Sequence, residues 1–375
     1  MKILVTTGIF PPDVGGPARF VPEICKKLSL DNDVSVITYS DKTSDNYQFD
    51  FKVYRLNRNY LKIIRFLKTI KTIYKIGKDV DIIFVNGIWL ETYITNILLK
   101  KTIYRKIVGD PVWEKYNNKN NKFIEFDEFQ KVKVNFFYSL LKFLRNRSIK
   151  ASKLIIVPSD HLKSFVKNTG FSGEIIKINN GTFISEYNEV NKNNNFLIVS
   201  RLVKHKNIDL VINAFKIINE NLDLKFILKI VGDGPEYKNL ENLVQKLNLS
   251  GQIFLEGRKD ELELEKYYKE ATFFIQASSY EGSPHSVLEA INYNNYVLAT
   301  NFGGVVEILS PNYSELIPLN NGKFDVKILY NILENILMNN VATLSKINEA
   351  KKNLDKNYNI NSTIDSYLKL FSNEQ

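Results

Sequence analysis

The stretch Ser278-Ser-Tyr-Glu-Gly-Ser-Pro-His-Ser-Val-Leu-Glu-Ala290 decides the fold expected for this chain. It follows an apolar run, Phe273–Gln276, that predicts a buried strand, and Pro284 suits the first turn of a helix. In an open α/β sheet, ligands bind where strands end and helices begin. Backbone N–H groups at the start of this helix are therefore expected to hold a phosphate, and they belong to Ser283, His285, Ser286 and Val287.

Charged side chains surround this predicted phosphate site. Glu281 lies in the loop and Glu289 one to two turns into the helix, where carboxylates suit hydrogen bonds to sugar hydroxyls. A second loop, from Ser200 to Lys206, follows another predicted strand and offers Arg201 and Lys206 to a diphosphate from the other side. Arginine binds phosphate as a fork and lysine as a point charge. The two loops together predict a pocket for a sugar diphosphate.

Short runs rich in Ile and Val alternate with longer helical patterns, which indicates βαβ units around parallel sheets. The polar stretch Glu186–Asn195 has no periodicity and marks a junction. We expect an α/β protein with two Rossmann-like doubly wound domains, at 1–185 and 186–357, and a C-terminal helix at about 358–375 that can pack back on the first. The expected strands are Lys2–Thr7, Val34–Tyr39, Ile82–Val85, Lys106–Val108, Leu154–Pro158, Phe196–Ser200, Lys225–Val231, Ile253–Glu256, Phe273–Gln276 and Tyr296–Thr300.

The composition excludes several classes of protein. The chain has 375 residues, of which 44% are hydrophobic and 25% charged, so it is neither disordered nor fibrous. Its single cysteine excludes a disulfide-built scaffold and a cysteine-based zinc or iron–sulfur site. No apolar run approaches the ~20 residues that cross a bilayer, and no signal-peptide cleavage site follows the apolar start. We therefore expect a cytoplasmic protein.

The net charge of +10 is concentrated in one half of the chain. Residues 1–188 hold 31 Lys and Arg against 18 Asp and Glu, whereas residues 189–375 hold 20 against 23. Such asymmetry indicates a polyanionic partner for one domain, either a nucleic acid or an anionic membrane surface. The sequence offers no motif that reads RNA or DNA, so we expect the membrane and no nucleic acid.

Two segments of the basic half, Arg58–Lys78 and Lys131–Lys150, carry basic and apolar residues on separate helical faces. One interpretation is a pair of surface helices that dock on the sheet, with solvated lysines. The other places at least one helix flat on an anionic bilayer. In the second interpretation, the residues that contact the acceptor or the membrane are Arg58, Lys62, Arg65, Lys68, Lys142 and Arg145.

A third loop, Gly8–Pro17, follows the first strand and opens a helix. Gly16 has no side chain, so the backbone there can approach a ligand closely, unless the glycines only serve a tight turn. The loop lacks the Gly-x-Gly-x-x-Gly fingerprint of nicotinamide enzymes. The Asp-x-Asp pairs that start at Asp31 and Asp79 both precede strands, at the edge of the sheet away from ligands, so turn roles are favoured and no metal is expected.

A series of motifs runs in order along the chain: Pro-Pro-x-x-Gly-Gly after the first strand, Arg201 with Lys206, Val231-Gly-Asp-Gly-Pro235, Gly257, Glu281-x7-Glu289, Gly303-Gly304 and Glu307. This order resembles glycosyltransferase family 4, the retaining nucleotide-sugar transferases of GT-B fold. The likeness extends from about Lys2 to Leu316. It implies two Rossmann-like domains facing across a cleft, the first holding the acceptor and the second the nucleotide sugar. It also implies transfer without a covalent enzyme nucleophile.

The resemblance, carried over by position, implies a role for each residue of the pocket. Arg201 and Lys206 would stabilise the departing diphosphate, whose charge grows in the transition state. Glu281 would contact the donor sugar near the reacting centre. The other implied donor-binding residues are Glu289 for the ribose, Gly257 and Arg258 for the base, Gly16, and the amides of Ser283, His285, Ser286 and Val287 for the phosphates.

One region departs from the family pattern. Many members carry a histidine near the donor sugar after a first-domain strand, and the corresponding region here is Val108-Gly-Asp-Pro-Val-Trp-Glu114. Asp110 stands in that place. We expect it to act as a base or as a ligand of a sugar hydroxyl, the alternative being a structural loop carboxylate.

The sequence therefore predicts a retaining, metal-independent transferase without a cofactor. It would move a sugar from UDP- or GDP-sugar to a lipid-linked or polysaccharide acceptor, of lipopolysaccharide, O-antigen or capsule type, at the cytoplasmic membrane face. A nucleotide-sugar epimerase or hydrolase of the same fold is the alternative. A nucleic-acid-binding module is the third hypothesis.

Overall fold

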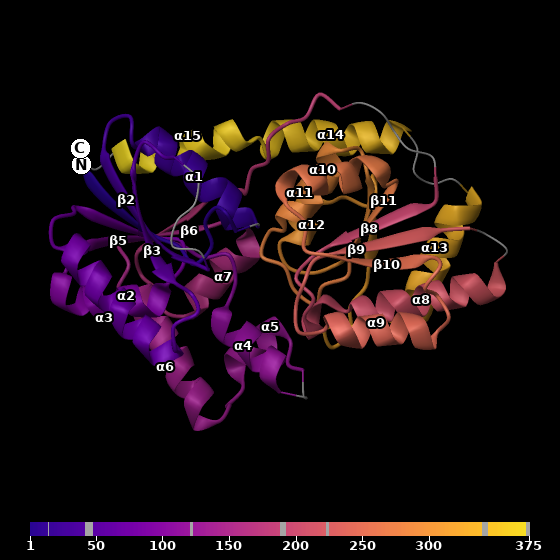
Figure 1. The fold of residues 1–375 in the computed structure, drawn as a ribbon, viewed down its shortest axis with the longest axis horizontal. Helices are drawn as coiled ribbons and strands as arrows, with labels where there is room; N and C mark the ends of the chain where they lie inside the picture. Colours follow the sequence, from indigo (N-terminus) through magenta and orange to yellow (C-terminus); the bar gives the residue numbers. More distant parts are fainter. Residues whose placement is uncertain are drawn as a thin grey trace. The chain divides into compact units, whose positions relative to one another are not determined.

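The computed structural model describes residues 1–13, 15–41, 48–120, 123–187, 193–222, 225–339 and 344–372. The chain forms two compact α/β units (Figure 1). Each unit contains one parallel sheet with helices on both faces, so the predicted class of two doubly wound domains is confirmed. Unit 1 comprises Met1–Val112, Lys133–Asn179 and Asn361–Gln375, and unit 2 comprises Trp113–Val132 and Asn180–Ile360.

The unit 1 sheet has the order β3-β2-β1-β4-β5-β6-β7. The direction of winding reverses at β1, which pairs in parallel with β2 on one side and β4 on the other. Its strands are β1 (Lys2–Thr6), β2 (Asp33–Ser40), β3 (Lys52–Asn57), β4 (Ile82–Val85), β5 (Thr102–Lys106), β6 (Leu154–Val157) and β7 (Glu174–Lys177). Its helices are α1 (Gly16–Leu28), α2 (Lys62–Gly77), α3 (Trp89–Leu99), α6 (Phe136–Lys150), α7 (Asp160–Asn168) and α15 (Ile360–Ser372).

Two helices from opposite ends of the chain cover one face of this sheet. The ring of Phe20 in α1 lies 4.9 Å from that of Tyr367 in α15, and Phe84 of β4 lies 5.7 Å from Phe371 of α15, between ring centroids. The other face packs against α2, whose Ile73 is fully buried among strand residues. The helix α3 contacts both α2 and α6 on that side (Figure 1).

The unit 2 sheet has the order β10-β9-β8-β11-β12-β13. Its strands are β8 (Asn195–Val199), β9 (Ile227–Val231), β10 (Ile253–Gly257), β11 (Phe273–Gln276), β12 (Tyr296–Thr300) and β13 (Ser314–Ile317). Its helices are α4 (Pro111–Lys119, from Trp113 onward), α5 (Phe126–Lys131), α8 (Ile208–Asn221), α9 (Tyr237–Lys246), α10 (Glu261–Glu270), α11 (His285–Asn292), α12 (Val305–Ile308), α13 (Val326–Asn339) and α14 (Leu344–Asn357), with a 3-10 turn at Lys204–Lys206.

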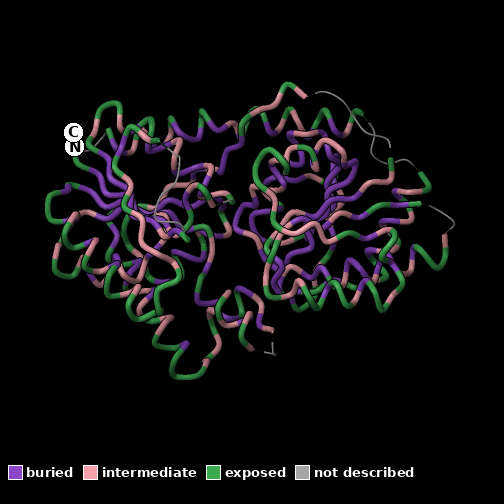
Figure 2. The backbone as a smooth tube through the Cα atoms, in the orientation of Figure 1, coloured by how far each residue is buried: buried purple, intermediate pink, exposed green. Residues whose placement is uncertain are grey.

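Side chains on alternate faces of these strands belong to two apolar layers in unit 2. Phe196, Ile198 and Ile230 pack against α8, α9 and α13, whereas Leu197 and Phe274 pack against α10, α11, α12 and α14. The strands are therefore buried on both faces, and Figure 2 shows them as the buried centre of the unit. Such continuous apolar runs are typical of parallel sheets covered by helices, which is why sequence periodicity located most of them.

Three strands were missed and one was misplaced. The missed strands, β3, β7 and β13, all lie at sheet edges, where half-exposed positions interrupt the apolar run. Strand β5 was expected at Lys106–Val108 but spans Thr102–Lys106. Its Arg105 and Lys106 are buried, and Arg105 interrupts the apolar run that a hydrophobicity pattern relies on.

The division into units differs from the expected boundaries. Residues 113–132, which the sequence placed in the first domain, cluster with unit 2, and unit 2 begins again at Asn180 rather than 186. The last helix clusters with unit 1 from Asn361 onward. Within the described ranges, no helix combines the length and the apolar character needed to cross a membrane.

Candidate active site

The predicted phosphate loops lie at the point where the unit 2 sheet reverses its winding. Strand β8 pairs in parallel with β9 on one side and with β11 on the other. The loop with Arg201 and Lys206 leaves the carboxyl end of β8, and the loop with Glu281 leaves the carboxyl end of β11. The structure thus brings both loops together at the position where open α/β sheets bind ligands.

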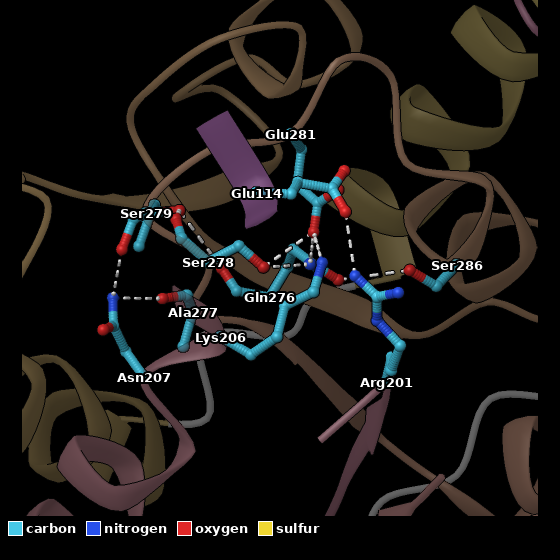
Figure 3. Close-up of polar contacts among 11 residues, drawn as sticks. Glu114, Arg201, Lys206, Asn207, Gln276, Ala277, Ser278, Ser279, Glu281 and Ser286 are labelled. Atoms are coloured by element: carbon cyan, nitrogen blue, oxygen red, sulfur yellow. Dashed lines mark hydrogen bonds and ion pairs between the residues drawn. The ribbon is translucent and has the colours of Figure 1, made fainter. Parts of the chain in front are cut away.

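Three side chains hold the carboxylate of Glu281 in one orientation (Figure 3). Its Oε1 atom forms an ion pair with Lys206 and accepts hydrogen bonds from Gln276 Nε2 at 2.6 Å and Ser278 Oγ at 2.7 Å. The Lys206 and Glu281 side chains are only 14% and 17% exposed. Ser286 Oγ donates to Gln276 Oε1 at 3.1 Å, so the first turn of α11 belongs to the same network.

Two glycines support the backbone of the Glu281 loop. The Gly304 N–H donates to the Glu281 carbonyl at 2.8 Å. A Cβ atom on Gly304 would lie 1.9 Å from the Gly282 carbonyl oxygen, and one on Gly303 would lie 2.4 Å from the Glu281 oxygen. The backbone of Gly303-Gly304 packs directly on the backbone of the Glu281 loop, and only a residue without a Cβ atom permits this contact. The Gly303-Gly304 pair therefore positions the loop without itself carrying a functional side chain.

Two glycines also pack against the backbone of the loop after β8. A Cβ atom on Gly232 would lie 1.9 Å from the Ser200 oxygen, and one on Gly234 would lie 2.3 Å from the Leu202 oxygen. The Gly232 N–H also donates to the Gly257 carbonyl at 2.8 Å, which brings the end of β10 to the same edge of the sheet. Gly257 has a φ of 69° and open space beside it, and Arg258 is exposed.

The N-terminus of α11 has the properties of an anion site. The helix begins at His285 with Pro284 as its N-cap, one residue later than expected, and Pro284 supplies no capping side chain. The first N–H groups of a helix have no acceptor within it, so those of His285, Ser286 and Val287 point outward. Ser283, just before them, is 8% exposed, and its Oγ has no hydrogen-bond partner in the part of the chain that the structure describes. A phosphate satisfies such a group of donors.

Glu289 was predicted for the site, and His205 lies next to the predicted Lys206. Glu289 is half-buried in α11 and accepts a hydrogen bond from the Tyr268 hydroxyl at 2.8 Å. His205 is buried, and burial together with the charges of Lys206 and Arg201 lowers its pKa well below the ordinary value. The imidazole next to Lys206 is therefore neutral and adds no charge to the pocket.

The segment Trp113–Val132 contacts the Glu281 loop in a way that the sequence did not predict. The Trp113 ring lies 5.4 Å from His205 and 5.6 Å from Tyr280, and Phe126 stacks on Tyr280 at 3.9 Å with an angle of 9°. Glu125 Oε1 accepts from the Gly322 N–H at 2.8 Å. Tyr280 directly precedes Glu281, so these aromatic contacts also fix the Glu281 loop.

Arg201 is more accessible than Lys206. Its guanidinium Nη2 donates to Glu114 Oε2 at 2.9 Å, and the two side chains are 57% and 40% exposed (Figure 3). Glu114 lies in α4, in the segment described above. Both cations of the predicted diphosphate site are thus paired with carboxylates of unit 2.

Asp110 lies in unit 1 and is 0% exposed. Its carboxylate forms an ion pair with Arg145 of α6 and accepts from the Val112 N–H at 3.0 Å, at the start of α4. This buried, ion-paired arrangement favours the structural loop carboxylate, and the role of Asp110 as a base or sugar ligand stays a prediction. Arg145, at 3% exposed, does not face a membrane, which corrects its expected role.

The other basic residues of the two amphipathic segments divide into bound and exposed side chains. Arg58 forms ion pairs with Asp13 and, at 3.0 Å, with Asp41, which raise its pKa. Arg65 donates to the Arg58 carbonyl at 2.6 Å, so neither arginine projects freely outward as expected. Of the other predicted lysines, Lys62 and Lys68 are exposed and Lys142 is half-buried. Gly16, predicted to approach the donor, is the first residue of α1 in unit 1.

The fold matches solved structures over the whole chain. HepE of Anabaena, in a structure with UDP and glucose, has a TM-score of 0.76 at 16% identity, and the match covers 100% of both chains. Sucrose-phosphate synthase of Thermosynechococcus elongatus has a TM-score of 0.80 at 16% identity, covering 99% of this chain and 98% of that one. The chain has the GT-B fold.

The sequence comparisons agree with this GT-B fold. Residues 180–352, which hold both loops of the candidate site, match the family Glycosyl transferases group 1. An uncharacterized glycosyltransferase of Methanocaldococcus jannaschii is 27% identical over 368 residues, covering 96% of this chain and 94% of that protein. Together these findings support glycosyltransferase activity.

Proposed function

We propose that this chain transfers a sugar, with retention of configuration, from a UDP- or GDP-sugar to a lipid-linked or polysaccharide acceptor. The observation that carries the proposal is the joint position of Lys206, Glu281 and the N-terminus of α11 at the switch point of the unit 2 sheet. A cation, a fixed carboxylate and helix N-terminal N–H groups are what a sugar diphosphate requires. The complexes of HepE with UDP and glucose and with UDP-glucose support a nucleotide-sugar donor.

The proposed chemistry assigns charge stabilisation to the cations. Negative charge grows on the diphosphate as the glycosidic bond breaks, and groups already aimed at it stabilise the transition state. Lys206, Arg201 and the α11 N–H groups supply positive charge there, so the proposal needs no metal ion or other cofactor. Glu289 would bind the ribose, and Gly257 with Arg258 would border the base.

Glu281 is proposed to bind a hydroxyl of the donor sugar rather than to attack the sugar. Three donors already converge on its Oε1 atom, which fixes the carboxylate and lowers its reactivity as a nucleophile. Retention would then follow from attack by the acceptor hydroxyl on the face that the diphosphate leaves. This is the mechanism implied by the resemblance to family 4, to which we propose the chain belongs.

The proposal predicts acceptor-dependent turnover. A panel of UDP- and GDP-sugars is incubated with the full chain, with and without a membrane extract as a source of acceptor, and release of UDP or GDP is followed. We expect release from one donor that depends on the extract, with the sugar recovered in the lipid or polysaccharide fraction. Free sugar or an epimer formed without extract would instead favour the hydrolase or epimerase.

We further propose that unit 1 binds the inner face of an anionic membrane. At the start of α2 and on α6, large apolar side chains lie exposed next to lysines: Ile63 is 74% exposed, Phe136 84% and Phe143 55%. Exposed Lys62 and Lys68 lie in the same stretch of α2. Apolar side chains beside lysines suit insertion at the level of anionic head groups. This surface would bring the enzyme to a lipid-linked acceptor.

Vesicle flotation tests this membrane surface. We expect the protein to float with vesicles of phosphatidylcholine and phosphatidylglycerol at low salt and to be released by high salt, because about 1 kcal/mol per lysine depends on surface charge. The double variant Ile63→Ser/Phe136→Ser should bind roughly tenfold or more weakly, since insertion of each large apolar side chain contributes about 1.5–3 kcal/mol.

The matched control is Leu262→Ser, which removes an apolar side chain that is 80% exposed on α10 of unit 2. It should leave flotation unchanged. Equal recovery on neutral and anionic vesicles, or equal loss in both variants, would contradict the membrane assignment.

A further inference from the structure

The two cations of the candidate site are paired with carboxylates in different ways. The Lys206 and Glu281 side chains are 14% and 17% exposed, and Glu281 has two additional donors. The Arg201 and Glu114 side chains are 57% and 40% exposed. In the described ranges of the chain, the Glu114 carboxylate has no donor besides Arg201. The Lys206–Glu281 pair is therefore a fixed part of the site, whereas Arg201 can exchange Glu114 for another anion.

Exposure also sets the strength of the second pair. An exposed ion pair contributes only about 0–1 kcal/mol, because water screens it and both side chains lose freedom. A diphosphate carries more charge than a carboxylate and offers the same forked geometry to a guanidinium. A ligand that also reaches the α11 N–H groups can therefore displace Glu114 from Arg201.

We infer that Glu114 is an internal counter-ion that occupies the diphosphate-binding face of Arg201 and must be displaced when the donor binds. This inference rests on the proposed function, because it takes Arg201 as a ligand of the donor diphosphate. Glu114 then weakens the binding of a nucleoside diphosphate and leaves the binding of a nucleoside unchanged. A nucleotide without a phosphate at Arg201 gains nothing from opening the pair, whereas a nucleoside diphosphate replaces one anion by another.

The anchoring of the segment explains why the carboxylate stays near Arg201. Trp113, the neighbour of Glu114, is 1% exposed and packs against His205 and Tyr280. Phe126 stacks on Tyr280 further along the same segment. The helix that carries Glu114 is thus held to unit 2 by aromatic contacts, and only its side chain has to move. Figure 3 shows Arg201 and Glu114 pointing toward one another beside the Glu281 cluster.

The test is a calorimetric titration of the full chain with UDP, GDP and the corresponding nucleosides. In Glu114→Gln, the Kd of the nucleoside diphosphate that binds should fall about three- to fivefold at low salt, since one competing ion pair is gone. The nucleoside should bind as in the wild type. In the Arg201→Ala background, Glu114→Gln should bring no gain. Glu114→Ala repeats the test with a side chain that cannot hydrogen bond to Arg201.

Glu128→Gln is the matched control, because it removes one exposed negative charge from the same segment. It should leave the Kd unchanged. The inference is overturned if Glu114→Gln binds the diphosphate as the wild type does while Arg201→Ala weakens it, or if the gain persists without Arg201. If neither the wild type nor Glu114→Gln binds any nucleoside diphosphate, the proposed function itself fails and the inference falls with it.

Discussion

Lys206→Ala is expected to lower kcat by roughly 10²–10³-fold, the usual cost of losing one group that stabilises developing negative charge. The Lys206 side chain is only 14% exposed, and its ion pair with Glu281 fixes its charge at the diphosphate site. The loss of the positive charge also raises the KM for the donor. Steady-state kinetics of the variant, with the donor found in the panel, measure both effects.

Lys204→Ala provides the matched control for this prediction. Lys204 belongs to the same 3-10 turn but is exposed, so its removal takes away an equal charge without touching Glu281. We expect its kcat within about twofold of the wild type, as for exposed sites generally. A Lys206→Ala enzyme that turns over like Lys204→Ala would remove Lys206 from the diphosphate site.

Asp110→Ala is expected to destabilise unit 1 by about 3–5 kcal/mol, because it leaves the Arg145 guanidinium buried without a counter-charge. Asp110 is 0% and Arg145 3% exposed, so water cannot replace the lost carboxylate cheaply. Burial already lowers the pKa of Arg145, and the Asp110 charge opposes that shift. Thermal unfolding should show a clearly lower Tm for the variant.

The double variant Asp110→Ala/Arg145→Met separates a structural role from a catalytic one. It removes both charges and should recover part of the Tm, since removing a buried ion pair whole costs less than leaving one of its charges unpaired. If Asp110 were instead the base of the reaction, Asp110→Asn would abolish turnover while Tm stayed near that of the wild type.

The sequence predicted the central part of unit 2 because its strands are continuous apolar runs and its loops carry distinctive glycines and prolines. Phe273–Gln276 was predicted residue for residue, and α11 was placed within one residue. Edge strands such as β13 lacked that signal. Strand β5 shares only Lys106 with the expected strand, and this lysine is buried against Phe20 and Tyr367, with its Nζ 3.7 Å from the Phe20 centroid.

Such an environment arises only from the tertiary fold. Phe20 lies in α1 and Tyr367 in α15, at opposite ends of the chain, and burial there lowers the pKa of Lys106 to about 7. No local pattern announces a lysine enclosed by distant aromatic rings. Sequence reasoning therefore treated Lys106 as an ordinary strand residue.

The candidate site shows the same limit. The sequence analysis identified both loops but missed Glu114, because residues 113–132 were assigned to the first domain. Glu114 and Arg201 are far apart in the sequence and meet only in the folded chain. A run of aromatic residues around Trp113 and Phe126 was the available signal, and its partner Tyr280 lies far along the chain. Helical periodicity likewise identified a basic face containing Arg145, but it gave no sign that this arginine turns inward to Asp110.

Hydrogen exchange of the full chain, with and without a saturating nucleoside diphosphate, tests the central claim most directly, because it locates the ligand on the backbone. We expect slower exchange at the amides of Ser283, His285, Ser286 and Val287 and at those of 201–206, where a diphosphate would accept from the N–H groups at the start of α11 and order the Arg201 loop. Protection confined to other parts of the chain, or none at all with UDP and GDP, would contradict it.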